Sequence, residues 1–360
     1  MSQPEEGDGK GFVVGEWLQT RGADNDVAVC TRVRLARNVR GYRFPGAQDE
    51  AEARDLVQHV RSCIEAKDKG HGLPEPLMAA ELASVSELEL QLLVERHLIS
   101  RELAASKRPR SVAVNTAESI ALMINEEDHL RLQVFASGFQ TRAAWLRAEA
   151  LDDALVQRLP LAFHEHFGFL TSCPTNAGTG LRLSVMLHLP ALVWSDQVEK
   201  LTNVAQKIHL AVRGLYGEGS RAIGDFYQVS NQVTLGRTED EIVDEVSLAV
   251  SKFVAWEREL RKTLLEGAAR VRTLDRVHRA LGVVERARIL TSDEAMTCMS
   301  ALRFGCHTGL FDQFRPMDLN RALLVSQPAH LQRYRGTELD PVERDEVRAD
   351  LVRQFLRLGG

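Results

Sequence analysis

The hydrophobic positions between residues 27 and 235 fall mostly in short runs, several of which alternate with polar positions. A period of two residues is typical of half-buried strands. The runs predict strands near residues 27–35, 112–114, 120–124, 132–135, 167–170, 181–189, 208–215 and 226–233. Helical periodicity interrupts them at 48–66, 85–103, 142–158 and 196–207. Because short links join the strands, we expect an α+β fold in which helices flank a largely antiparallel β-sheet.

After Gly236 the pattern becomes helical throughout. Helix start signals stand at Thr238-x-x-Glu241, Thr291-x-x-Glu294 and Asp340-Pro341, and the last of these helices is expected to stop at Gly359. The pattern therefore predicts three parts: a flexible N-terminal tail, an α+β domain and an all-α C-terminal domain, at 1–26, 27–257 and 258–360.

The charge and the apolar segments exclude several classes of protein. The 360 residues include 45 basic and 50 acidic side chains, a formal net charge of −5, so no general attraction for nucleic acid is expected. The N-terminus lacks the apolar segment of a signal peptide, and the most apolar stretch, 181–194, is interrupted by Arg182 and His188 and is too short to span a bilayer. We therefore expect a cytoplasmic protein that does not contact a membrane.

The cysteines and histidines do not suggest a metal site. The five cysteines are odd in number and include no C-x-x-C pair, which argues against a disulfide framework or a zinc site. His164 and His166 resemble a metal-binding pair, but two histidines at i and i+2 of an expected helix would not face each other. We therefore expect no metal held by protein side chains.

Arginine is unusually frequent, since 37 of the 45 basic residues are Arg and only 8 are Lys. Genomic base composition explains most of such an excess, so only arginines within motifs are informative. Arg32 and Arg34 are two apart in a predicted strand and project from one face, for which a solvated polar face is the ordinary interpretation. Arg131, Arg182 and Arg213 also lie in or beside apolar runs, where a guanidinium is costly unless an anion or a carboxylate satisfies it. Such strands could clamp a triphosphate with Mg²⁺ without a P-loop, whose pattern the sequence lacks.

Acidic residues and one cysteine stand at the links between these predicted strands. Glu126, Glu127 and Asp128 are consecutive, Glu218 lies in a Gly-flanked loop, and Cys173 precedes a turn that contains proline. An acidic turn and a structural cysteine are the ordinary interpretations. Near several arginines, however, a thiolate would be favoured, and a flexible acidic loop is of the kind that closes over a substrate.

Four of these strings together resemble a known family. CTRVRLARN, NEEDHLR, CPTNAGTGLR and RGLYGEG occur in the order and roughly the spacing of the phosphagen (guanidino) kinases, over about residues 30–235. HLIS at 97–100, LRLSVMLHLPAL at 181–192 and YQVSNQVTLG at 227–236 are similar to the bacterial protein-arginine kinases. The resemblance implies a phosphagen-kinase catalytic domain that uses ATP and Mg²⁺ to phosphorylate arginine side chains of proteins.

The resemblance also implies roles for individual residues. Glu127 and Glu218 would grip the target guanidinium and take its proton, and Cys173 would lie against it. His97 would lie beside the nucleotide, although by its sequence alone it is a surface residue of a helix. The expected ATP-binding residues are Cys30, Thr31, Arg32, Val33, Arg34, His97, Arg131, Arg182, Leu183, Ser184, Val185, Met186, Arg213, Gly214, Leu215, Tyr216 and Gly217.

The C-terminal domain contains a further motif. Arg344, Asp345, Arg348 and Ala349 fit the R-D-x-x-R-A pattern with which the protein-arginine kinases form an allosteric phosphoarginine site. Arg344 and Arg348 are four apart on one predicted helix face, so two guanidinium groups could share one phosphate. An ordinary charged helix face is the alternative.

A protein substrate is favoured over a free guanidino compound such as arginine. Small-molecule guanidino kinases carry a helical domain before this part of the fold, whereas 30 residues precede Thr31 here. The remaining alternative is a non-catalytic phosphoarginine-binding adaptor, which would not need both glutamates and all five arginines. By resemblance, the partners are proteins with exposed arginine, a Clp-type ATPase and protease, a zinc-binding activator protein and a second copy of the chain. The role would be stress regulation. Cys30 and Ala177 depart from the usual family pattern, which could shift substrate fit.

Overall fold

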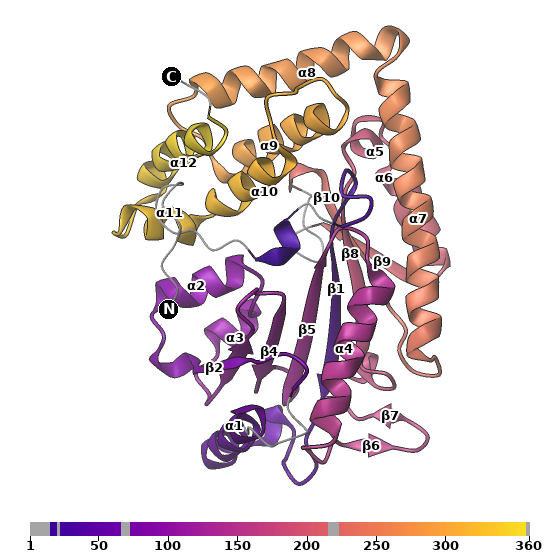
Figure 1. Cartoon of the computed structure of the whole chain (residues 1–360), viewed down its shortest axis with the longest axis vertical. Helices are drawn as coiled ribbons and strands as arrows, with labels where there is room; N and C mark the ends of the chain where they lie inside the picture. Colours follow the sequence, from indigo (N-terminus) through magenta and orange to yellow (C-terminus); the bar gives the residue numbers. More distant parts are fainter. Residues whose placement is uncertain (1–14, 20–21, 66–72, 215–222, 358–360) are drawn as a thin grey trace.

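The computed structural model describes residues 15–19, 22–65, 73–214 and 223–357. Its largest element is an eight-stranded sheet in which all neighbouring strands pair antiparallel, in the order β2-β3-β4-β5-β1-β8-β10-β9. A short hairpin, β6-β7, lies beside it (Figure 1). The strands are β1 (Ala28–Arg37), β2 (Met78–Glu81), β3 (Ser111–Val114), β4 (Ile120–Ile124), β5 (Leu130–Ser137), β6 (Phe163–His164), β7 (Gly168–Phe169), β8 (Leu181–His188), β9 (Leu210–Gly214) and β10 (Phe226–Asn231).

Helices lie on both faces of this sheet, and those on one face close the main hydrophobic core. The helices of this part are α1 (Glu50–Glu65), α2 (Glu87–Glu95), α3 (Arg101–Ala105), α4 (Thr141–Val156), α5 (Pro190–Trp194), α6 (Val198–Lys207) and α7 (Glu239–Leu264). Helix α4 packs on β1 and β5, and α7 packs on β8 and β10 (Figure 1). Along β1, Val33 and Leu35 enter this core, and the residues that alternate with them, Arg32 and Arg34, face the opposite side of the sheet.

The C-terminal part is entirely helical in the described residues. It consists of α8 (Gly267–Arg286), α9 (Ser292–His307), α10 (Pro316–Val325), α11 (Pro328–Arg335) and α12 (Pro341–Phe355). These five helices, called the C-terminal helices below, run from orange to yellow at the top of Figure 1 and contact α2 through α11. Helix α7 joins the two parts, and the boundary predicted at 257/258 falls inside it.

Buried arginines connect the C-terminal helices to the sheet. Arg303 of α9 is fully buried, and it donates to the backbone carbonyls of Asn25 (2.6 Å) and Asp26 (3.0 Å) and to Nδ1 of His188 (2.8 Å). Arg261 of α7 donates to the carbonyls of Asp26 (3.1 Å) and His188 (3.1 Å). The two parts of the chain are therefore held together by polar contacts as well as by apolar packing.

Most of the predicted elements are present, and the fold class is confirmed. The helix expected at 85–103 is instead two, α2 and α3, because His97 takes a left-handed backbone conformation (φ 60°) and Ser100 caps a new helix. His164 and His166 lie in the β6-β7 hairpin rather than on a helix. Strand β2 had no signal in the pattern. No described helix is both long enough and apolar enough to cross a membrane.

Part of the segment expected as a flexible tail is packed. Residues Glu16–Leu18 form a short 3₁₀ helix, η1, in which Trp17 and Leu18 are buried. Trp17 stacks on Phe135 of β5, with ring centroids 5.7 Å apart. The two apolar side chains are too few to show periodicity, which is why the pattern did not reveal this contact.

Candidate active site

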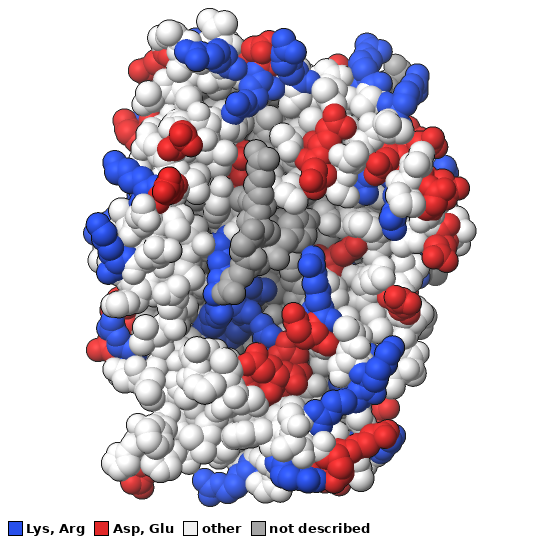
Figure 2. All heavy atoms as spheres, turned by 180° about the vertical axis from the view of Figure 1, so that it is seen from behind, with Lys and Arg blue, Asp and Glu red and all other residues white. Residues whose placement is uncertain are grey.

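The face of the sheet opposite the main core lines a cavity of about 1010 Å³. All five arginines expected to bind phosphate line it: Arg32, Arg34, Arg131, Arg182 and Arg213, called the arginine cluster below. In Figure 2, which views the molecule from behind, basic side chains gather at the centre of the face with acidic side chains directly below them. The cavity therefore combines a concentrated positive charge with adjacent carboxylates.

Strand register brings the arginine cluster together from four strands. Arg32 and Arg34 are two apart on β1, as expected, and Arg34 pairs with Arg182 of β8. Arg131 of β5 pairs with Ala36 on the other side of β1. Arg213 enters from β9 at the edge of the sheet. The antiparallel register therefore converts five distant sequence positions into one surface.

The arginine cluster has the electrostatics of an anion site. Burial and repulsion from the neighbouring arginines lower the pKa of Arg32 to about 10 and the pKa of Arg34 well below its ordinary value. The Nη2 atom of Arg32 donates to Oε1 of Gln228 (2.7 Å). The Nε atom of Arg34 is buried and has no hydrogen-bond partner among the described residues. A guanidinium in such a place is costly unless an anion satisfies it, so the cluster fits a polyphosphate.

Several of the other expected ATP-binding residues present no side chain to the cavity. Val33, Leu183 and Val185 lie in the core on the opposite face of the sheet, so only their backbone could meet a ligand. The Thr31 hydroxyl donates to the carbonyl of Gly138 (2.8 Å), a contact that stabilises the fold. Met186 and Gly214 line the cavity.

Two smaller residues of the same set do not line this cavity but a small recess of their own. Burial raises the pKa of Cys30 to about 12, so this side chain remains a thiol. The Ser184 hydroxyl donates to the carbonyl of Arg32 (3.3 Å), and both residues line a small recess next to His97. Leu215, Tyr216 and Gly217 lie outside the described residues.

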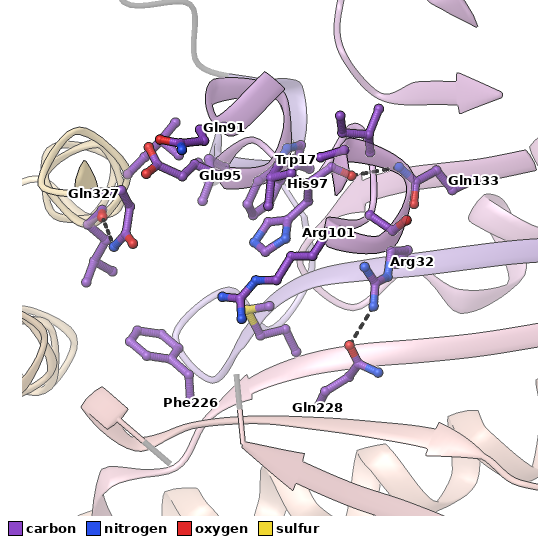
Figure 3. Close-up of a pocket in the computed structure, with 18 of the residues that line it drawn as sticks. Trp17, Arg32, Gln91, Glu95, His97, Arg101, Gln133, Phe226, Gln228 and Gln327 are labelled. Carbon is purple, nitrogen blue, oxygen red and sulfur yellow. Dashed lines mark hydrogen bonds between the residues drawn. The ribbon is translucent and has the colours of Figure 1, made fainter. Parts of the chain in front are cut away.

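His97 is turned into the cavity rather than lying on a helix surface, so the surface interpretation is wrong. Its ring meets that of Trp17 edge to face, with centroids 5.4 Å apart, as Figure 3 shows. Its carbonyl accepts from the amide of Gln133 (2.7 Å). Burial together with the charges of Arg32 and Arg101 lowers the pKa of His97 to about 4. The ring is therefore neutral near neutral pH and suits contact with an uncharged ligand group.

The acidic turn Glu126–Asp128 reaches the edge of the arginine cluster. Glu126 forms an ion pair with Arg131, and although burial opposes it, this charge helps to hold the pKa of Glu126 below its ordinary value. Glu127 is exposed, and burial of its carboxyl followed by repulsion from Asp128 and Glu126 raises its pKa. Glu127 also forms a hydrogen bond with Cys173. The structure therefore brings two of the three expected catalytic residues together; Glu218 lies outside the described residues.

Asp128 and Asn38 fix this arrangement, a role that the sequence pattern did not indicate. Asp128 Oδ1 accepts from Nδ2 of Asn38 (2.6 Å) and from the backbone amide of Ser172 (2.6 Å). Asn38 also donates to the carbonyl of Leu170 (3.0 Å). These contacts join the acidic turn to the segment that carries Cys173. Both residues stand inside the strings CTRVRLARN and NEEDHLR, which was the available signal.

The R-D-x-x-R-A motif lies on α12, and one of its two arginines already forms hydrogen bonds with other segments of the protein. Arg348 is 1% exposed, and it donates through Nε to the carbonyl of Ser326 (2.8 Å) and through Nη1 to the carbonyl of Leu290 (2.6 Å) and to Asp345. Ala349 is also buried, whereas Arg344 is half-buried. The two guanidinium groups therefore have different surroundings, although they are four residues apart on one helix.

Comparison with known proteins defines the class of the chain. Residues 57–260 match the family described as "ATP:guanido phosphotransferase, C-terminal catalytic domain". Residues 270–359 match the family described as "Protein-arginine kinase McsB C-terminal domain". The chain therefore belongs to the ATP:guanido phosphotransferase family.

Curated relatives are similar over nearly the whole chain. A protein from Desulforamulus reducens is 41% identical over 341 residues, which covers 95% of both chains. A protein from Symbiobacterium thermophilum is 42% identical over 340 residues, which covers 94% of this chain and 96% of its own. Each of these relatives is named "Protein-arginine kinase".

Solved structures share the fold of the sheet part. A lombricine kinase matches with a TM-score of 0.58 and 24% identity over 68% of this chain and 69% of its own. A duplicated taurocyamine kinase from Schistosoma mansoni, solved with components of a transition-state analogue, matches with a TM-score of 0.55 and 25% identity over 70% of this chain and 35% of its own.

Proposed function

We propose that the protein transfers the γ-phosphoryl group of ATP to arginine side chains of other proteins. The observation that carries this proposal is the arginine cluster, set beside the Glu127–Cys173 pair on one face of the sheet. The similarity to curated protein-arginine kinases over 95% of the chain supports a protein substrate.

The reaction needs cations for one partner and carboxylates for the other. A guanidinium is a poor nucleophile because its lone pairs are delocalised and its pKa exceeds about 12. Glu127 can hold the incoming guanidinium in line with the γ-phosphate and accept a proton from its attacking nitrogen. The raised pKa of Glu127 makes it a stronger base than an ordinary glutamate. Cys173 forms a hydrogen bond with Glu127 and so orients this carboxylate.

The arginine cluster would act on the phosphates. Its guanidinium groups are fixed by the sheet before ATP binds, so they can neutralise charge on the transferring phosphoryl group with little reorganisation. Mg²⁺ would arrive as Mg-ATP and supply further charge neutralisation. The described residues contain no group of three or more His, Cys, Asp or Glu side chains that could hold a metal on their own.

The test is incubation with Mg-ATP and an unfolded arginine-rich protein, scored by mass spectrometry for acid-labile phosphate on arginine. Free arginine at equal guanidinium concentration is the comparison. We expect phosphoarginine in the protein and little transfer to the free amino acid. Transfer to free arginine alone would contradict the proposal, and ATP binding without transfer to either would favour a phosphoarginine-binding adaptor.

The wider role is also a proposal and depends on the resemblance. We infer that the cytoplasmic protein acts as a homodimer and that its phosphorylation marks proteins for a Clp-type ATPase and protease during stress. A zinc-binding activator protein would regulate it. Phosphoarginine bound at Arg344 and Arg348 would act allosterically, and the match of residues 270–359 to the C-terminal domain of a protein-arginine kinase supports this assignment.

A further inference from the structure

The cavity extends well beyond the arginine cluster. Its far end is lined by residues of the C-terminal helices and of the loop between α10 and α11: Ser292, Asp293, Met296, Leu324, Gln327 and Pro328. Figure 3 shows Gln327 on one side of this space, across from Arg101 and His97. A volume of about 1010 Å³ exceeds what the phosphates alone would fill.

The position of the acidic turn gives the direction in which a nucleotide must lie. Asn38, directly after β1, bonds to Asp128, so Glu127 stands near the end of this strand. The phosphoryl group to be transferred must lie next to Glu127, and the rest of the nucleotide must therefore run toward the start of β1. Arg34 and Val29 are five residues apart, which is roughly 16 Å along a strand.

The C-terminal helices are already part of the wall at that end. Val29 and Cys30 share a hydrophobic cluster with Met296 of α9 and Leu324 of α10. Asn320 of α10 donates to the carbonyl of Leu18 (3.1 Å), which attaches the same helix to η1. These contacts are made by buried residues, so the wall is built into the fold.

A carboxylate of α2 fixes the second edge of this wall. Glu95 Oε1 accepts from the backbone amide of Ala329 (2.7 Å), and Oε2 accepts from the amide of His330 (3.1 Å). Oε2 also pairs with Nδ1 of His330 (2.6 Å). A carboxylate at the N-terminus of a helix is favourable, and here it holds α11 against α2 beside the cavity.

The chemistry of the far end suits a purine nucleoside and not a phosphate. Trp17, His97 and Phe226 offer ring surfaces, and Met296 offers a polarizable thioether. His97 is neutral because its pKa is lowered. The Gln327 amide is oriented by its hydrogen bond to the carbonyl of Leu323 (3.1 Å).

We propose that the C-terminal helices form one wall of the site for the adenosine part of ATP, so that a bound nucleotide contacts both the sheet and these helices. The inference rests on the proposed function, since it takes ATP as the ligand of the arginine cluster. It assigns to α9, α10 and the loop after α10 a direct part in nucleotide binding.

The experiment compares Mg-ATP with inorganic tripolyphosphate in the presence of Mg²⁺, both titrated by calorimetry. Gln327→Trp and Ser292→Trp each place a bulky ring in the far end of the cavity. We expect each to weaken ATP binding roughly tenfold. Tripolyphosphate affinity should stay within about twofold, because this ligand occupies only the arginine cluster. Gln206→Trp, on the exposed side of α6, is the matched control and should change neither affinity.

Equal losses for the two ligands, or no loss for either, would overturn the inference and leave the proposed function intact. A wild-type protein that binds neither ligand would instead contradict the proposed function. Circular dichroism checks that each variant folds. Should a variant fail to fold, hydrogen exchange on the wild type decides: ATP, and not tripolyphosphate, should slow exchange in residues 323–330, and equal protection by the two would overturn the inference.

Discussion

The arginine cluster and the buried arginines of α7, α9 and α12 have opposite surroundings. Arg34 is half-buried on the cavity face, and its buried Nε has no partner among the described residues. Arg261, Arg303 and Arg348, called the junction arginines below, donate to backbone carbonyls of distant segments. At Arg34 the fold therefore leaves a buried guanidinium donor without an acceptor, whereas at the junction arginines it provides several.

The largest effect is expected from the arginine cluster. Arg34→Ala should lower the rate of phosphoarginine formation by roughly 10³-fold, because it removes a preorganised positive charge that stabilises the transferring phosphoryl group. Thermal stability should not fall, because the substitution relieves repulsion among buried cations. The rate is measured by mass spectrometry and the stability by thermal unfolding. A large loss of stability with a normal rate would show that Arg34 resembles the junction arginines.

The next effect concerns the junction arginines. Arg303→Ala removes the donor for the carbonyls of Asn25 and Asp26 and for the His188 ring, and should reduce the free energy of unfolding by about 3 kcal/mol. Urea unfolding measures this change. Arg279→Ala, which removes an exposed ion pair with Asp275, is the control and should cost less than about 0.5 kcal/mol. Equal effects of the two substitutions would contradict a joining role for Arg303.

A third effect separates the carboxylate side of the site from the arginine cluster. Glu127→Gln should reduce transfer about 100-fold while leaving ATP affinity unchanged, because the base is lost and the arginines remain. In the wild type, the rate should rise with pH through the raised pKa of Glu127, above the usual 4.5, as the carboxyl loses its proton. This acidic limb should disappear in Glu127→Gln. Glu165→Gln, in the exposed hairpin, should keep the limb, and its persistence in Glu127→Gln would remove Glu127 from the mechanism.

The smallest effect is expected at Cys173. Its hydrogen bond lowers the pKa of Glu127, so Cys173→Ala should move the acidic limb of the rate profile to higher pH and slow transfer roughly threefold at a pH on that limb. Cys63→Ala, at a cysteine of α1 whose thiol donates to the carbonyl of Arg158, should leave the limb in place. An unchanged profile in Cys173→Ala would show that the thiol does not tune Glu127.

The sequence predicted those features that depend on neighbouring residues. The period of two in β1 placed Arg32 and Arg34 on one face, and the capping signals at Thr238 and Asp340 begin helices as expected. Alternation says which face a residue occupies, but not which residue of another strand lies opposite. The pairing of Arg34 with Arg182 depends on register and became visible only in the structure.

Long-range contacts account for what the sequence did not reveal. The spacing of Arg344 and Arg348 suggested that two guanidinium groups could share one phosphate, but Arg348 already donates to the carbonyls of Ser326 and Leu290, which lie elsewhere in the sequence. His97 was interpreted as a surface residue of a helix because no local sequence signal predicts a left-handed backbone conformation at a histidine.

The hydrogen bond from Arg348 to the carbonyl of Ser326 has a thermodynamic consequence. Gln327, the next residue, lines the cavity, so one short loop touches both the R-D-x-x-R-A motif and the proposed nucleotide wall. A ligand that shifts this loop when it binds at one end changes affinity at the other end by a factor that is equal in both directions. If phosphoarginine tightened ATP binding about threefold, ATP would tighten phosphoarginine binding about threefold. The ATP concentration in a cell would then set the affinity of the motif for phosphorylated proteins.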